Sequence, residues 1–160
     1  MGYQCAVCHE FHDGLPQIGF EYPDPYFDVP EDEREERIFV TSDLCCIDNE
    51  DFFIRGVIEI DVHELDQPFG FGVWVSQKRE NYQTYVDNFD TDSIGPFFGW
   101  LSTRLVCYAE ETFLLKTMAH FRTGGTRPFI EVEPTGHPLA VDQRNGINVE
   151  RAWELVHHYM

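Results

Sequence analysis

Positive charge is scarce in this chain of 160 residues, in which 11 Lys and Arg face 29 Asp and Glu and leave a formal net charge of −18. Such a field repels phosphate backbones and anionic lipid headgroups. No basic cluster interrupts the acidic sequence. The composition therefore argues against binding to nucleic acid or to a membrane surface, and it favours cationic partners such as a basic protein or a metal ion.

Long apolar runs are missing as well. No stretch approaches the ~20 apolar residues that cross a bilayer, and the first residues lack the charged and apolar regions of a signal peptide. The five cysteines are an odd number in a chain of ordinary size, which argues against a framework of disulfides. We therefore expect a cytoplasmic protein with reduced thiols.

Familiar catalytic motifs are also absent. The sequence contains no nucleophile elbow, no phosphate-binding loop and no HExxH motif. Gly70-Phe71-Gly72 lacks the third glycine of a dinucleotide-binding fingerprint, and a strand pattern follows it. No catalytic residue is therefore predicted.

Aromatic residues, by contrast, are abundant and make up 15% of the chain. They favour strands and bury large areas, and 160 residues are enough for one domain with its own core. We expect a single domain over residues 1–160. Its parts are a metal knuckle over 1–20, an acidic loop with three prolines over 21–37, and a β-rich core with a C-terminal helix over 38–160.

Alternation of apolar and polar residues predicts the strands. Between Phe53 and Val62 one face is formed by Ile54, Gly56, Ile58, Ile60 and Val62, which indicates a half-buried strand. Phe71, Val73 and Val75 repeat the pattern with Trp74 on the opposite side. Further strands are expected at Ile38–Thr41, Leu44–Ile47, Phe97–Leu101, Leu114–Arg122 and Phe129–Val132, the last two forming a hairpin.

Two segments have helical spacing. After Ser76, a possible N-cap, Tyr82, Tyr85, Val86 and Phe89 fall on one helix face. At the C-terminus, Asn148 caps a predicted helix whose apolar stripe is Val149, Ala152, Trp153, Val156 and Met160. Many strands with two main helices predict an α+β fold with a largely antiparallel sheet.

The N-terminal motif Cys5-Ala-Val-Cys8-His9-Glu-Phe-His12 carries the most chemical information. Two thiolates separated by two residues can grip one zinc ion, and a following histidine can close around it. A structural site needs a fourth ligand, for which Cys45, Cys46, His9 and Cys107 are candidates. Adjacent residues on a strand point to opposite faces, so one of Cys45 and Cys46 at most is expected to reach the ion.

Several motifs along the chain resemble a family of prokaryotic proteins known as domain of unknown function 2199. They are CAVCHEFH with Leu15-Pro16, Ser42-Asp43-Leu44-Cys45, Phe53-Ile54-Arg55-Gly56, Gly72-Val73-Trp74-Val75-Ser76, Gly95-Pro96-Phe97-Phe98-Gly99-Trp100-Leu101, Arg127-Pro128 and His137-Pro138-Leu139-Ala140. The resemblance implies zinc ligands at Cys5, Cys8, His12 and Cys45. The family pattern has glycine where this chain has His9, so the turn after Cys8 is expected to differ. The resemblance implies no activity.

Three further groups of residues are candidates for chemistry or binding. Arg55, Glu59 and His63 share one face of a predicted strand. They would either line a polar groove or form the solvent-exposed face of this half-buried strand. The aromatic run from Gly95 to Trp100 would form a ligand platform or core packing. His137, before Pro138, is expected in a hydrogen-bonded turn that fastens the C-terminal helix.

Together these observations predict a non-catalytic, acidic interaction module that contains structural zinc and binds or neutralises a basic protein partner. One alternative is a zinc-dependent hydrolase, which would need an open coordination position held by three protein ligands and a water. Another is a metal-free domain in which the thiols are simply buried. The sequence predicts no particular oligomeric state.

Overall fold

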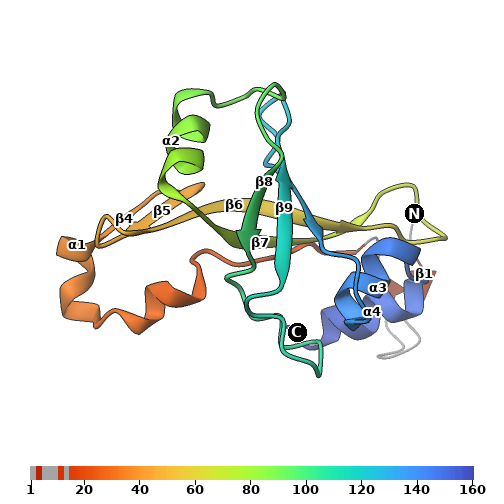
Figure 1. Ribbon diagram of the computed structural model, residues 1–160. Coiled ribbons are helices and arrows are strands. Elements are labelled where there is room, and N and C mark those ends of the chain that lie inside the picture. The colour runs from red at the N-terminus through yellow and green to blue at the C-terminus, as the bar shows by residue number, and fades with distance from the viewer. Residues whose placement is uncertain (1–2, 5–10, 13–14) are drawn as a thin grey trace.

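The computed structural model describes residues 3–4, 11–12 and 15–160, with the backbone alone for 3–4 and 11–12 (Figure 1). The strands in these ranges are β1 (Tyr3–Gln4), β2 (Phe11–His12), β3 (Ile18–Gly19), β4 (Ile38–Val40), β5 (Leu44–Ile47), β6 (Asp51–Ile60), β7 (Phe69–Gln77), β8 (Phe97–Trp100), β9 (Lys116–His120) and β10 (Phe129–Val132). The helices are the 3₁₀ helices η1 (Asp24–Asp28) and η2 (Glu31–Glu33), and α1 (Arg34–Arg37), α2 (Arg79–Asp87), α3 (Pro138–Asn145) and α4 (Val149–His157).

Every strand expected from alternation forms, with its ends shifted by a residue or two. These strands build one mixed sheet of order β3-β7-β6-β10-β9-β8, to which β5 and then β4 add beside β6. The pairing of β6 with β7 is the longest, from Phe52 opposite Gln77 to Ile60 opposite Phe69. The sheet is mostly antiparallel, with β3 parallel to β7 and β10 parallel to β6. The α+β class is confirmed.

The sheet curls until its last strand meets β7 again. Directly after β8, Leu101 pairs with Val75, and the amide of Ser102 donates to the carbonyl of Trp74 at 2.8 Å. The amide of Trp74 donates to Thr103 Oγ1 at 3.0 Å. These bonds use backbone groups of β7 that the short strand β3 does not reach, and buried backbone groups need such partners.

The expectation of two main helices was incomplete. α2 and α4 form where the apolar spacing predicts them, and the side chain of Asn148 accepts a bond from the amide of Arg151 as its cap. Ser76 does not cap α2, because β7 continues to Gln77 and Ser76 Oγ accepts from the amide of Trp100 instead. No helix in the described part of the chain is both long and apolar enough to span a membrane.

The helix α3 differs from the sequence-based expectation, which places only a turn at His137. Pro138 occupies the first turn, where its missing N–H costs no hydrogen bond. His137 caps the helix, because its Nδ1 accepts from the amide of Leu139 at 3.0 Å, and its Nε2 lies 3.0 Å from the carbonyl oxygen of Glu111. The expected hydrogen-bonded turn at His137 is thus confirmed, and it starts a helix.

One face of β6 and β7 packs into the main core. Ile54, Ile58 and Ile60 are completely buried there, as the alternation predicted. Trp153 and other apolar residues of α4 cover this core from the other side. Each such side chain stabilises the fold by about 1.5–3 kcal/mol relative to an exposed position. Met160, expected to extend the stripe of α4, lies beyond the helix and is exposed.

The opposite face of the same strands forms a second, smaller core. Its buried residues are Val29, Cys45, Ile47, Phe53 and Trp74. It is covered by β4 and by residues 21–37, which we call the acidic arm and which run beneath β4 and β5 in Figure 1. Trp74 Nε1 donates to the carbonyl of Phe20 at 2.9 Å. The expectation that this face of β6 and β7 meets solvent was therefore wrong around Trp74.

A buried polar network ties α3 and α4 to the segment after β8. The hydroxyl of Tyr108 donates to Asp142 Oδ2 at 2.7 Å, and Arg151 donates to the same oxygen from Nη2 at 2.8 Å. Asp142 is buried. Buried carboxylates need such partners, so this network fixes both C-terminal helices against the core.

Candidate functional site

The predicted zinc ligands are described to different extents. Cys5 and Cys8 lie outside the described residues. His12 ends β2, which pairs with β1 so that Tyr3 faces His12 and Gln4 faces Phe11, and its side chain is not described. Cys45 is described in full. The zinc set therefore stays a prediction.

Cys45 is a fully buried member of the second core. It lies opposite Phe53 on β6 and opposite Val40 on β4. Burial, with a smaller contribution from Cys46, raises the pKa of Cys45 to about 12. In the described surroundings the thiol of Cys45 is therefore protonated at neutral pH, whereas zinc would bind it as the thiolate. β5, which carries Cys45, lies at the other end of the sheet from β1 (Figure 1).

Two of the other candidate ligands, Cys46 and Cys107, are described. Cys46 points to the face opposite Cys45, as the strand parity predicted, and is half-buried beside the main core. Cys107 is buried and accepts a bond from the hydroxyl of Tyr159 at 3.5 Å. His9 lies outside the described residues. Among the residues that are described, no three His, Cys, Asp or Glu side chains come together to hold a metal ion.

The polar row on β6 does not form one groove. Both carboxylate oxygens of Glu59 accept from Arg122 Nη1, at 3.1 and 3.2 Å. His63 lies beyond the end of β6, with its Nε2 3.1 Å from the carbonyl oxygen of Asn145. Arg55 donates from Nη1 to the carbonyl of Ser42. Each member of the row thus serves a different contact.

The aromatic run on β8 divides between core and surface. Phe97 packs against the main core. Phe98 and Trp100 are 42% and 41% exposed, and their rings lie 5.0 Å apart in an edge-to-face arrangement. Core packing is thus confirmed for Phe97, whereas a ligand platform at Phe98 and Trp100 stays a prediction.

A charged cluster that the sequence reasoning missed lies where β6 changes its neighbour. Along one edge of β6, β5 begins opposite Ile54 and β10 begins opposite Val57, and the two strands run in opposite directions. The residues just before them, Asp43 and Arg127, meet in an ion pair with 2.8 Å between Nε and Oδ1. We call this place the switch point.

Arg55 belongs to the same cluster. Its amide donates to the carbonyl of Asp43 at 3.0 Å, and its Nη1 donates to the carbonyl of Ser42 at 3.2 Å. Gly56 follows it, and a Cβ at that position would come within 2.8 Å of the carbonyl oxygen of Pro128. The close approach of the start of β10 to β6 thus requires glycine here. The available signal was a charged residue close to the start of each of two predicted strands, Asp43 one residue before Leu44 and Arg127 two residues before Phe129.

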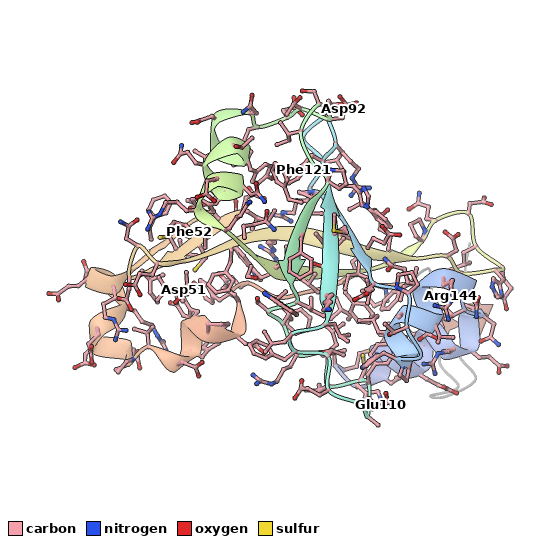
Figure 2. The ribbon with its side chains drawn as sticks, viewed as in Figure 1. Asp51, Phe52, Asp92, Glu110, Phe121 and Arg144 are labelled. Atoms are coloured by element: carbon pink, nitrogen blue, oxygen red, sulfur yellow. The ribbon has the colours of Figure 1, made fainter. Side chains whose placement is uncertain are left out.

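A pocket of about 170 Å³ opens beside the Asp43–Arg127 pair. Its charged lining comes from that pair, Asp90 and Arg122, and its apolar walls include three aromatic rings, Tyr85, Phe89 and Phe121. Phe121 lies just beyond β9 on the side of α2 (Figure 2). Burial raises the pKa of Tyr85 to about 12, so its hydroxyl is protonated at neutral pH and can donate.

The acidic arm presents a different surface. It contains eight carboxylates and two arginines in 17 residues. Tyr22 and Tyr26 stack with ring centroids 4.0 Å apart, and Phe27, which is 59% exposed, meets Tyr26 edge-on. The guanidinium of Arg34 lies 4.8 Å above the ring of Tyr26. The arm thus combines exposed negative charge with aromatic rings that already hold a cation.

The comparisons with known proteins give a family and no activity. A family model described as an uncharacterized protein conserved in bacteria, DUF2199, matches residues 4–147. No curated protein and no solved structure matches the chain. The resemblance drawn from the sequence motifs is thereby confirmed, and the chain belongs to the bacterial family of domain of unknown function 2199.

Proposed function

We propose that this protein is a non-catalytic interaction module that binds a basic protein partner through its acidic arm, and that structural zinc holds its N-terminal segment. The observation that carries the proposal is the combination of charge and exposed rings on the arm. Phe27 and Phe39 are 59% and 58% exposed at the arm and at the strand that follows it. Exposed aromatic residues within a charged rim are frequent anchors of protein interfaces.

The arm suits lysine and arginine side chains for two reasons. Carboxylates attract them over a distance and speed the encounter. Aromatic faces then hold a cation at close range, as Tyr26 holds Arg34 within the protein itself. The apolar stems of Lys and Arg can lie along the same rings. A basic segment of a partner would therefore gain both charge and apolar contact.

Charge-neutralising variants test the arm. In one variant the exposed residues Asp28, Glu31, Asp32, Glu35 and Glu36 become Asn or Gln. In a matched control, five exposed carboxylates outside the arm are neutralised in the same way, at Asp66, Glu110, Glu133, Glu150 and Glu154. Fluorescence anisotropy with a labelled Lys- and Arg-rich peptide then measures affinity at ~0.02 M and ~0.3 M salt.

The arm variant is expected to bind the peptide at least about tenfold more weakly than the control at low salt, with most of the difference lost at high salt. Equal weakening in both variants would show that net charge alone attracts the peptide. That result would contradict a specific surface on the arm.

The zinc part of the proposal is supported by the shortness of the N-terminal hairpin. β1 and β2 have two residues each, and the segment between them contains Cys5 and Cys8. A hairpin of this size is not stable alone in water. Zinc bound by Cys5, Cys8 and His12 would hold it, since apparent binding energies of structural zinc reach about 10–16 kcal/mol in finger peptides.

Metal analysis of single variants tests the site and its fourth ligand. Cys5→Ser, Cys8→Ser and His12→Ala are expected to abolish stoichiometric zinc, and Cys45→Ser tests the fourth ligand implied by the family. Cys46→Ser is the matched control on the same strand. Zinc that survives all of these changes, or is absent from the gently purified protein, would overturn the proposal. Loss in only three variants, with an exchangeable water on the metal, would favour the zinc hydrolase instead.

A further inference from the structure

Two arginines at the switch point have more hydrogen-bond donors than the described structure uses. Arg127 donates from Nε to Asp43 Oδ1 and, within the described residues, from no other nitrogen. Arg55 donates from Nη1 to Ser42, while its buried Nε has no partner in the same part of the chain. A guanidinium carries five N–H groups, and a buried one without a partner is unfavourable.

The single negative charge of Asp43 cannot neutralise both Arg55 and Arg127. Its Oδ1 accepts from Arg127, and its Oδ2 accepts from the hydroxyl of Ser42 at 3.0 Å. Burial, and next the charge of Arg127, lower the pKa of Arg55, whereas Asp43 and Glu21 act in the opposite direction. Glu59 is held by Arg122. A further anion beside Arg127 would therefore be stabilised by its guanidinium group.

The pocket beside Arg127 has room for a small molecule. Its volume of about 170 Å³ is close to the roughly 150 Å³ of an apolar cavity that holds benzene in another protein. Tyr85 packs against Phe89 and Phe121, with ring centroids 4.5 and 4.9 Å apart. These rings offer a continuous apolar wall next to a charged group, an arrangement typical of ligand sites.

We propose that this pocket binds a small monocarboxylic acid with an apolar body, whose carboxylate is received by the Nη atoms of Arg127. The side chain of Arg127 is held for this role by its bond to Asp43, and its carbonyl accepts from Arg122 Nε at 2.9 Å. A planar guanidinium edge matches a carboxylate with two parallel bonds. The body of the acid lies against Tyr85, Phe89 and Phe121.

Asp90 provides a second test of carboxylate binding in this pocket. It lines the pocket, and its Oδ1 accepts from the amide of Gly125 at 2.9 Å. Its negative charge opposes a bound carboxylate, so Asp90→Asn removes the repulsion and keeps an oxygen for Gly125. This variant is expected to bind the acid about two- to threefold more tightly, the change that a partly screened charge produces.

The test titrates the full-length protein with benzoate, benzamide and acetate and follows its amide resonances by NMR. Benzoate is expected to bind with a dissociation constant of about 1 mM. Benzamide, which lacks the charge, and acetate, which lacks the ring, are each expected to bind at least about tenfold more weakly. The largest shifts are expected at residues 85–90 and 121–128, which border the pocket.

Variants distinguish binding of benzoate in the pocket from general electrostatic attraction to the protein. Arg127→Lys keeps the charge and loses the planar fork, and it is expected to weaken benzoate about tenfold. Arg144→Lys makes the same exchange on α3, away from Phe121 in Figure 2, and should leave binding unchanged. If Arg127→Lys does not fold, Phe89→Ala decides instead, because Phe89 is 46% exposed and its loss should weaken benzoate with the fold intact.

Equal binding of benzoate and benzamide would overturn the inference, as would the same effect from Arg127→Lys and Arg144→Lys. Shifts confined to residues outside the pocket would overturn it too. None of these outcomes bears on the acidic arm, because the arm contributes no residue to this pocket.

Discussion

The hydroxyl of Tyr108 donates a 2.7 Å hydrogen bond to Asp142, whose carboxylate also accepts hydrogen bonds from Nε and Nη2 of Arg151. Because Asp142 is buried, Arg151→Ala would leave its charge with less compensation. We expect that change to lower the free energy of unfolding by about 3 kcal/mol. Tyr108→Phe removes one bond and leaves the ion pair, so it should cost about 1 kcal/mol. Urea denaturation of both variants checks this order, and the reverse order would contradict it.

Because of the second core, substitution of two aromatic residues, one within the core and one on the strand that covers it, is expected to affect stability very differently. Trp74 is fully buried there and bonded to Phe20, so Trp74→Ala should destabilise the fold by about 3–5 kcal/mol. Phe39, on the covering strand β4, is 58% exposed, and Phe39→Ala should change stability by less than about 0.5 kcal/mol. Thermal denaturation measures both. A mild effect at Trp74 would mean that the arm and β4 do not cover this face in solution.

Gly56 is expected to tolerate no side chain. In Gly56→Ala the new methyl group would meet the carbonyl oxygen of Pro128 and the side chain of Ile130, which pack directly beside it. We expect a loss of about 1–3 kcal/mol, as in other overpacked sites. Gly136→Ala is the control, since no atom lies within 4 Å of a Cβ there, and it should stay within about 0.5 kcal/mol of the native protein. Equal effects of the two variants in urea denaturation would contradict the close approach at the switch point.

Buried thiol and phenol groups predict a loss of stability in alkaline solution. Burial raises the pKa of Cys45 from 9.0, and those of Tyr82 and Tyr85 from 10.0, to about 12 in each case. The folded protein therefore holds these protons more tightly than the unfolded chain, and the stabilisation is complete below about pH 9. It falls as the pH rises from about 9 toward 12.

The urea midpoint should accordingly be lower at pH 10.5 than at pH 8, and Tyr82→Phe should reduce the difference because it removes one of the groups with a raised pKa. A midpoint that does not change over this range would show that these groups titrate alike in the folded and unfolded chains.

The strands were predictable because their signal is local. The alternation of Ile54, Ile58 and Ile60 needs no knowledge of the rest of the chain, and the structure buries all three. The second core was not predictable in the same way. Trp74 and Cys45 are buried by a segment whose charge and prolines suggested only a solvated loop.

The switch point brings together residues that are far apart in the sequence. Asp43 and Arg127 are 84 residues apart, and they meet because β5 and β10 start at neighbouring places along β6. Nothing within either segment specifies this. Of the predicted zinc set, Cys45 is described and lies in the second core, whereas the N-terminal motif stays a prediction.

The curled sheet has a consequence for behaviour at high concentration. An open edge strand offers unpaired N–H and C=O groups to other chains, which is a common start of aggregation. In the described part of this chain, β3 and β4 end the sheet with two and three residues, and β8 is followed by the contact with β7. An intruding strand would thus find little backbone to pair with, so a chain this rich in aromatic residues should remain monodisperse without a chaperone.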